Sequence, residues 1–108
     1  MAHLTIERAR TLYLNSKIML IRDEVASGGS VDQAAIDTRE VVRRAMDLGA
    51  AAITLVHNHP SGDSAPSRQD IAMTRDFINA AKGFGIPVHD HIIVGKNDFS
   101  SMRRAGLI

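Results

Sequence analysis

The chain has 108 residues, of which 44% are apolar, so it can build one hydrophobic core without disulfide bonds or a structural metal. Its 13 basic and 12 acidic side chains leave a net charge of +1, so the chain lacks the strong basic excess that is typical of nucleic-acid-binding proteins. The sequence contains no cysteine and no apolar N-terminal stretch with the form of a signal peptide or the length of a membrane span, so we expect a cytoplasmic protein that does not enter membranes.

The first part of the chain predicts a β-hairpin. Two apolar runs, residues 9–14 and 18–21, flank the short polar turn 15–17. The small residues 28–30 are expected to end the second strand, and residues 31–36 are compatible with a short third strand.

A first helix is expected after this hairpin, because a capping residue precedes a run with helical periodicity. Asp37 or Thr38 would cap the helix, and Gly49 would end it. The apolar face of this helix is predicted to consist of Val41, Val42, Ala45, Met46 and Leu48.

A longer run with helical periodicity lies in the second half of the chain. A second helix is expected from about Arg68 to Lys82, and Gly83 and Gly85 would end it. The buried face of this helix is predicted to consist of Ile71, Met73, Phe77, Ile78 and Ala81.

Three further apolar runs predict strands. Residues 51–56 form the run that leads into His57, and residues 88–94 and 98–101 form the other two. Because strands alternate with helices along the chain, we predict an α/β fold in which helices flank a mixed β-sheet.

The segment that follows residues 51–56 carries a candidate metal site. Side chains of a strand alternate between its two faces, so His57 and His59 would point the same way and reach one ion. Ser67 stands at the expected start of the second helix and Asp70 in its first turn, which adds a carboxylate. Two imidazoles and one carboxylate form the ligand set of a catalytic zinc site. The alternative is two ordinary loop histidines beside a simple capping box, but the combined spacing favours the metal site.

The pattern H-x-H, seven residues, S-x-x-D in this segment resembles the signature of the JAMM (MPN-domain) zinc metalloproteases. The sequence of residues 57–63, His-Asn-His-Pro-Ser-Gly-Asp, is similar to that of the RadC branch of the superfamily. Residues 39–45, 90–95 and 106–108 also resemble RadC segments. The resemblance implies a cytidine-deaminase-like α/β sandwich. It also implies that residues 1–108 are one RadC-like JAMM/MPN domain without the helical region that typically precedes it in RadC proteins.

The resemblance further implies a role for each site residue. His57, His59 and Asp70 would hold a zinc ion. The general base of the superfamily is a glutamate at the start of the first strand, and alignment of the hairpin places Glu7 there, with Glu24 as the competing candidate. The hydroxyl of Ser67 would donate a hydrogen bond to the developing oxyanion.

Two other groups of residues have a functional and a structural interpretation. His89, Asp90 and His91 form a second H-x-H motif, but no spaced carboxylate follows it, so an orienting role of Asp90 or His91 is favoured over ligation. Exposed arginines could contact phosphate, although helix arginines are usually solvated. The arginines considered are Arg39, Arg43, Arg44, Arg103 and Arg104.

The leading functional prediction is a zinc-dependent hydrolase of amide or isopeptide bonds that acts on a peptide or protein substrate. The alternative is a non-catalytic or DNA-associated interaction domain of the RadC type, and the near-neutral charge gives no support for nucleic acid as a partner. A phosphodiester hydrolase is a third alternative, but one metal with a single carboxylate ligand suits amide hydrolysis better. The sequence does not predict the oligomeric state.

Overall fold

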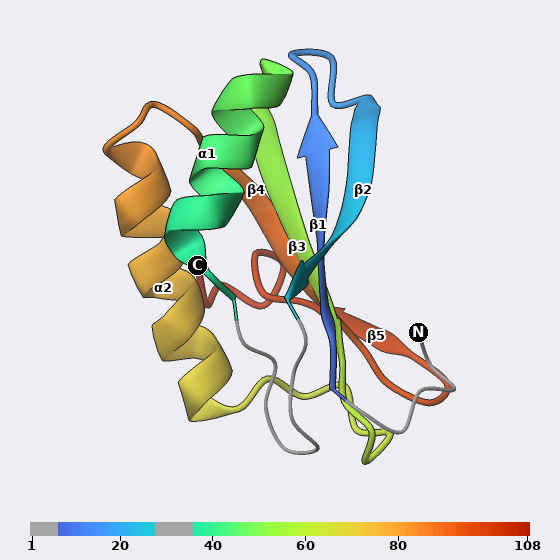
Figure 1. Ribbon diagram of the computed structural model, residues 1–108. Coiled ribbons are helices and arrows are strands. Elements are labelled where there is room, and N and C mark those ends of the chain that lie inside the picture. The colour runs from blue at the N-terminus through green and yellow to red at the C-terminus, as the bar shows by residue number, and fades with distance from the viewer. Residues whose placement is uncertain (1–6, 28–35) are drawn as a thin grey trace.

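The computed structural model describes residues 7–27 and 36–108. Within these two ranges, five strands form one sheet in the order β2-β1-β3-β4-β5, and two helices lie side by side on one of its faces (Figure 1). Strands β3 and β4 are parallel and the other neighbouring pairs are antiparallel, so the predicted α/β fold with a mixed sheet flanked by helices is confirmed. The bounds are β1 Ala9–Leu14, β2 Leu20–Ser27, α1 Thr38–Leu48, β3 Ala52–Asn58, α2 Arg68–Lys82, β4 Val88–Val94 and β5 Phe99–Ser101.

The predicted hairpin is present, but its second strand begins at Leu20 and not at Ile18. Ile18 belongs to the turn, with a φ of 60° that a strand does not allow. Asn15 closes this turn, because its side-chain oxygen accepts bonds from the backbone N–H groups of Lys17 at 2.9 Å and Met19 at 3.0 Å. The expected break at 28–30 and most of the expected third strand lie outside the described residues.

The first helix begins and ends where its capping residues predict. The side chain of Asp37 accepts a bond from the backbone N–H of Glu40, and Gly49 adopts the left-handed conformation at the C-terminus. Met46 departs from the prediction, since it is 59% exposed instead of buried. It lies on the side of α1 that lines a groove between the helices, together with the exposed Phe84, so it is not covered by the core.

The second helix matches its predicted bounds but buries a different face. Phe77 and Ala81 are buried as predicted, whereas Ile71, Met73 and Ile78 are only partly buried. Their place is taken by Asp70 and Thr74, which continue the stripe of Phe77 and Ala81 toward the N-terminus of the helix. The prediction failed here because apolar periodicity does not count a polar residue as part of a buried face.

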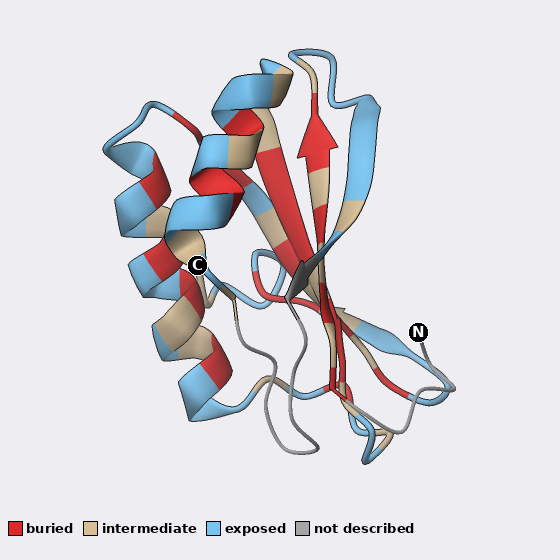
Figure 2. Cartoon of the chain, viewed as in Figure 1, coloured by how far each residue is buried: buried red, intermediate tan, exposed pale blue. Residues whose placement is uncertain are grey.

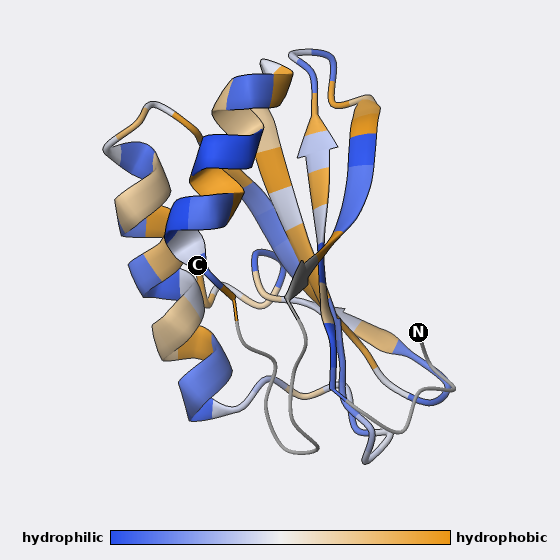
Figure 3. Cartoon of the chain, in the orientation of Figure 1, coloured by the Kyte–Doolittle hydropathy of each residue, from blue (hydrophilic) through white to orange (hydrophobic). Residues whose placement is uncertain are grey.

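The hydrophobic core fills the space between the helices and the sheet (Figure 2). Alternate residues of the central strands point toward the helices, so Tyr13, Ile53 and Leu55 are buried against them. Figure 3 shows the apolar residues along the strands and the hydrophilic outer surface of α1. The same alternation continues from Leu55 to His57, which is also fully buried.

Both helices are short. Helix α1 has 11 residues and α2 has 15, whereas a bilayer span needs roughly 20 mostly apolar residues. Within residues 7–27 and 36–108, no helix has the length and apolar composition to cross a membrane.

Candidate metal centre

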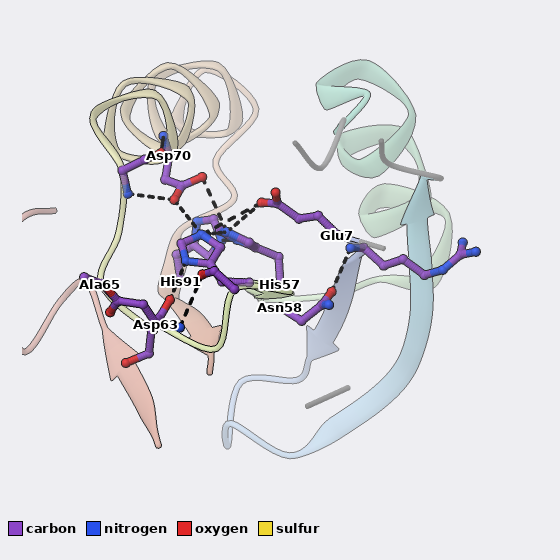
Figure 4. Close-up of polar contacts among 12 residues, drawn as sticks. Glu7, His57, Asn58, Asp63, Ala65, Asp70 and His91 are labelled. Atoms are coloured by element: carbon purple, nitrogen blue, oxygen red, sulfur yellow. Dashed lines mark hydrogen bonds and ion pairs between the residues drawn. The ribbon is translucent and has the colours of Figure 1, made fainter. Parts of the chain in front are cut away.

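Four side chains with metal-ligating atoms meet at one end of the interface between α2 and the sheet (Figure 4). Glu7 precedes β1, His57 and His59 lie at the end of β3, and Asp70 lies in the first turn of α2. One ligand atom from each residue lies within 4.8 Å of all the others. The fold therefore brings the three predicted ligands and the predicted base together.

The register of the sheet places Glu7 beside the histidines. Strand β1 is antiparallel to β3 and Ala9 pairs with His57, so the residues before β1 continue along the end of β3. Asn58 fastens this segment, because its side-chain oxygen accepts a bond from the backbone N–H of Arg8 at 2.7 Å and its own N–H donates to the carbonyl of Arg8 (Figure 4). Glu7 is only 4% exposed. The sequence interpretation gave Asn58 no role, since its partner lies 50 positions away in the chain.

The separations of the candidate ligand atoms fit a tetrahedral metal ion. The Nε2 atoms of His57 and His59 are 3.0 Å apart. The carboxylate of Asp70 lies 3.4 Å from Nε2 of His57 through one oxygen and 3.0 Å from Nε2 of His59 through the other. In a tetrahedral zinc site with bonds of about 2.0–2.1 Å, neighbouring ligand atoms are roughly 3.4 Å apart. Small outward movements would therefore suffice to admit the ion.

A capping box at the start of α2 orients Asp70. The hydroxyl of Ser67 accepts a bond from the backbone N–H of Asp70 at 3.0 Å, and the carboxylate of Asp70 accepts one from the backbone N–H of Ser67 at 2.8 Å. Burial raises the pKa of Asp70, but the adjacent His57 ring and the bonds from Ser67 outweigh burial and hold this pKa below its usual range. The carboxylate is therefore ionised and fixed in position, as a ligand must be.

The loop after β3 fixes the ring of His59. Its Nδ1 lies 2.8 Å from the backbone carbonyl oxygen of Asp63, so Nδ1 carries the proton and Nε2 presents its lone pair. The turn between β4 and β5 supports this loop, because the carbonyl of Gly62 accepts a bond from the N–H of Lys96. A Cβ atom at Gly95 would come within 2.5 Å of that same carbonyl oxygen. Only glycine fits at this close approach.

His91 contacts the ring of His57 (Figure 4). Its Nε2 is 2.6 Å from Nδ1 of His57, and its Nδ1 is 2.6 Å from the hydroxyl of Thr74. Burial, together with the neighbouring ring of His57, lowers the pKa of His91 to about 3, so the ring is neutral. His89 is exposed. Among the described residues, the second H-x-H motif therefore contributes a contact to His57 and no second group of ligands.

Glu24, the competing candidate for the base, lies on β2 outside the group of four. Its carboxylate accepts bonds from the guanidinium group of Arg44 on α1, the shortest at 2.9 Å. This hydrogen bond is the main reason that the pKa of Glu24 is lowered. The geometry explains Glu24 as the partner of Arg44.

The arginines considered for phosphate binding lie on separate surfaces. Arg44 is bound to Glu24, and Arg103 donates to two backbone carbonyl groups of β4 at 2.6 and 2.8 Å. Arg39 and Arg43 line the groove between the helices, whereas Arg104 lines a hollow beside β4 and β5. The described residues therefore do not gather these arginines into one basic patch.

Comparison with known proteins relates the whole chain to one family. The sequence matches the RadC-like JAB domain over residues 1–107. It is also 48% identical over 108 residues to a UPF0758 protein from Rhodobacter capsulatus. That alignment covers 100% of this chain and 50% of the relative, so the chain spans half the length of the relative.

Proposed function

The chain belongs to the family of RadC-like JAB domains, and from this premise we propose that it is a zinc-dependent hydrolase of amide or isopeptide bonds. The observation that carries the proposal is the group of Glu7, His57, His59 and Asp70, in which all members but the partly buried His59 are buried. Two imidazoles and one carboxylate would hold the ion and leave a fourth position open, as in catalytic zinc sites. When bound, the zinc would supply Lewis acidity, which lowers the pKa of a water molecule and polarises a carbonyl group.

Glu7 is proposed to move the protons of the reaction. Its Oε1 lies 3.3 Å from Nε2 of His57 and 3.9 Å from Nε2 of His59, so its carboxylate is adjacent to the proposed ligands. It would accept a proton from the attacking water and donate that proton to the leaving amine nitrogen. Burial of Glu7 keeps competing bulk water away from the carboxylate.

Ser67 is proposed to stabilise the oxyanion that forms when water attacks the substrate carbonyl. Its hydroxyl oxygen accepts the bond from Asp70 N–H, so its own proton stays available for a second partner. Ser67 is exposed at the start of α2, where a substrate could reach it. A donor of this kind typically contributes on the order of 3 kcal/mol to transition-state stabilisation.

The proposed substrate is a peptide or protein in the cytoplasm, since one ion with a single carboxylate ligand suits an amide carbonyl better than a phosphodiester. The bond to be cleaved is an amide, and the leaving group is an amine that needs the proton carried by Glu7. Nucleic acid is not part of the proposal, because the chain has a net charge of only +1.

The proposal is tested by zinc analysis and by hydrolysis of a panel of peptides and isopeptide-linked peptides. We expect about one zinc ion per chain and metal-dependent cleavage, both of which His59→Ala should abolish. The matched control is His89→Ala, because His89 is an exposed histidine outside the group. This substitution should change neither the zinc content nor the cleavage. A protein that binds no zinc would overturn the proposal. A protein that binds zinc but cleaves no member of the panel would support a non-catalytic interaction domain instead.

A further inference from the structure

We infer that His91 and Thr74 are positioning residues that determine which nitrogen of His57 faces the metal centre. The inference rests on the proposed function in so far as His57 is a ligand. The inference goes beyond the proposed function, because neither His91 nor Thr74 belongs to the group of Glu7, His57, His59 and Asp70. All three side chains are 0% exposed, so water cannot replace the bonds among them.

Three hydrogen bonds run in line from α2 to His57. The hydroxyl of Thr74 donates to the backbone carbonyl oxygen of Asp70 at 2.6 Å. The same hydroxyl oxygen lies 2.6 Å from Nδ1 of His91, and Nε2 of His91 lies 2.6 Å from Nδ1 of His57. We refer to Thr74 and His91 as the relay.

The position of each proton in this line of bonds follows from the backbone carbonyl oxygen of Asp70 at its end. A carbonyl oxygen can only accept, so the single proton of the Thr74 hydroxyl is used there. The hydroxyl oxygen must then accept from His91, which places the ring proton of His91 on Nδ1. His91 is fully buried, where a charged ring would be unfavourable, so its Nε2 keeps a lone pair and accepts from Nδ1–H of His57. His57 is thereby left with an unprotonated Nε2, the atom that faces His59 and Asp70.

A single hydrogen bond is enough to leave Nε2 of His59 unprotonated. Its Nδ1 donates to the carbonyl of Asp63 on the neighbouring loop. His57 lies deeper in the core, and the relay connects it to a carbonyl group on α2. That carbonyl belongs to Asp70, so the residue that offers a carboxylate through its side chain also anchors His57 through its backbone. The relay therefore links β3 to α2 at the metal centre.

The competing explanation is that His91 only fills space in the core. A space-filling role predicts that any residue of similar volume preserves the properties of His57 once the protein is folded. The relay predicts instead that a hydrogen-bond acceptor beside Nδ1 of His57 is essential. Four variants separate these two explanations, namely His91→Leu, His91→Gln, Thr74→Val and Thr74→Ser.

The first measurement uses metal-free protein with ¹⁵N-labelled histidine. The ring nitrogen shifts of His57 should report one tautomer, protonated at Nδ1, in the unmodified protein, in Thr74→Ser and in His91→Gln, because these retain the hydroxyl or an acceptor. His91→Leu and Thr74→Val should show mixed tautomers. Phe77→Leu is the matched control, since Phe77 is equally buried one turn further along α2 and contacts no member of the relay through a hydrogen bond.

The second measurement is zinc affinity of the folded protein, determined by competition with a chelator. Loss of a partner that orients a metal ligand typically weakens binding by about 10–100-fold, and we expect that loss for His91→Leu and Thr74→Val but not for Thr74→Ser or Phe77→Leu. The inference is overturned if His57 keeps one tautomer and full affinity without the relay, or if Phe77→Leu weakens binding equally. Should the unmodified protein bind no zinc, the proposed function fails, and the tautomer measurement still decides the role of the relay.

Discussion

The interface between α2 and the sheet has an apolar end and a polar end, and both are buried. At the apolar end, Phe77 and Ala81 of α2 belong to the cluster that includes Ile53 of β3. One to two turns earlier on the same helix face, Asp70 and Thr74 approach the buried histidines. A single stripe along α2 thus builds the core in one half and the candidate metal centre in the other.

The two ends are stabilised by different forces, and this difference determines which substitutions each end tolerates. Apolar burial is non-directional and scales with the area removed from water, so a side chain of similar volume can replace another at modest cost. A buried polar group needs a partner at the correct distance and angle, and losing one partner leaves the other unsatisfied. Substitutions at the apolar end should therefore affect stability, and substitutions at the polar end should affect metal binding and chemistry.

The strongest test of this difference at the apolar end is Phe77→Ala. Removing a fully buried ring should lower the free energy of unfolding by about 3–5 kcal/mol, because the cavity cannot be filled. Zinc affinity of the folded fraction should be unchanged. Urea unfolding at low temperature measures the first quantity and chelator competition the second. Phe84→Ala, at an exposed phenylalanine, is the control and should change stability by about 0.5 kcal/mol or less.

At the polar end, Glu7→Gln should separate chemistry from metal binding. Glutamine cannot accept and return a proton, so hydrolysis should fall by about 10²–10⁴-fold while the zinc content stays the same. Glu24→Gln is the matched control, since Glu24 pairs with Arg44 outside the metal centre, and its activity should stay close to that of the unmodified protein. The reverse pattern would transfer the role of base to Glu24.

The polar end should also lose stability in acid when the metal is removed. The pKa of His91 is lowered to about 3 in the folded protein from an ordinary value near 6.5. Below pH 6.5 the unfolded chain therefore binds a proton that the folded chain does not, and the free energy of unfolding decreases as the pH falls toward 3. At pH 5 this amounts to about 2 kcal/mol. The lowered pKa of Asp70 acts in the same direction, with its stabilising effect lost as the pH falls further.

Urea unfolding at pH 7 and pH 5 in the presence of a chelator measures this acid dependence. His91→Gln carries no titrating ring and should lose clearly less stability between the two pH values. An equal loss in the two proteins would show that other groups cause the acid dependence.

The parts of the fold that depend on local sequence could be predicted. The caps at Asp37 and Ser67 act within three residues of their partners, so the sequence predicted the starts of both helices correctly. Strand alternation likewise placed His57 and His59 on one side. What determined these features was already present within a single turn or strand.

The features that were predicted wrongly or missed depend on contacts between segments that are distant in the sequence. Asn58 has no visible role until β1 pairs with β3 and brings Arg8 to it. Thr74 is polar and so fell outside the predicted buried face, although the line of bonds to His91 makes its burial favourable. Met46 fits the apolar stripe of α1 but lines the exposed groove between the helices. Periodicity identifies which residues share a face, and only the assembled sheet determines how much of that face is covered.

A smaller loss of stability than at Phe77 is expected at Ser67, which lies where the capping box meets the polar end. As the cap of α2 its hydroxyl accepts the N–H of Asp70, so Ser67→Ala should lower the free energy of unfolding by about 1 kcal/mol. As a donor to the oxyanion, its loss should also lower kcat by roughly 100-fold with little change in zinc content. Ser67→Asp restores an acceptor for the cap but places a negative charge where the oxyanion forms, so stability should recover and turnover should not. If stability and turnover instead rise and fall together across these proteins, Ser67 acts only as a cap.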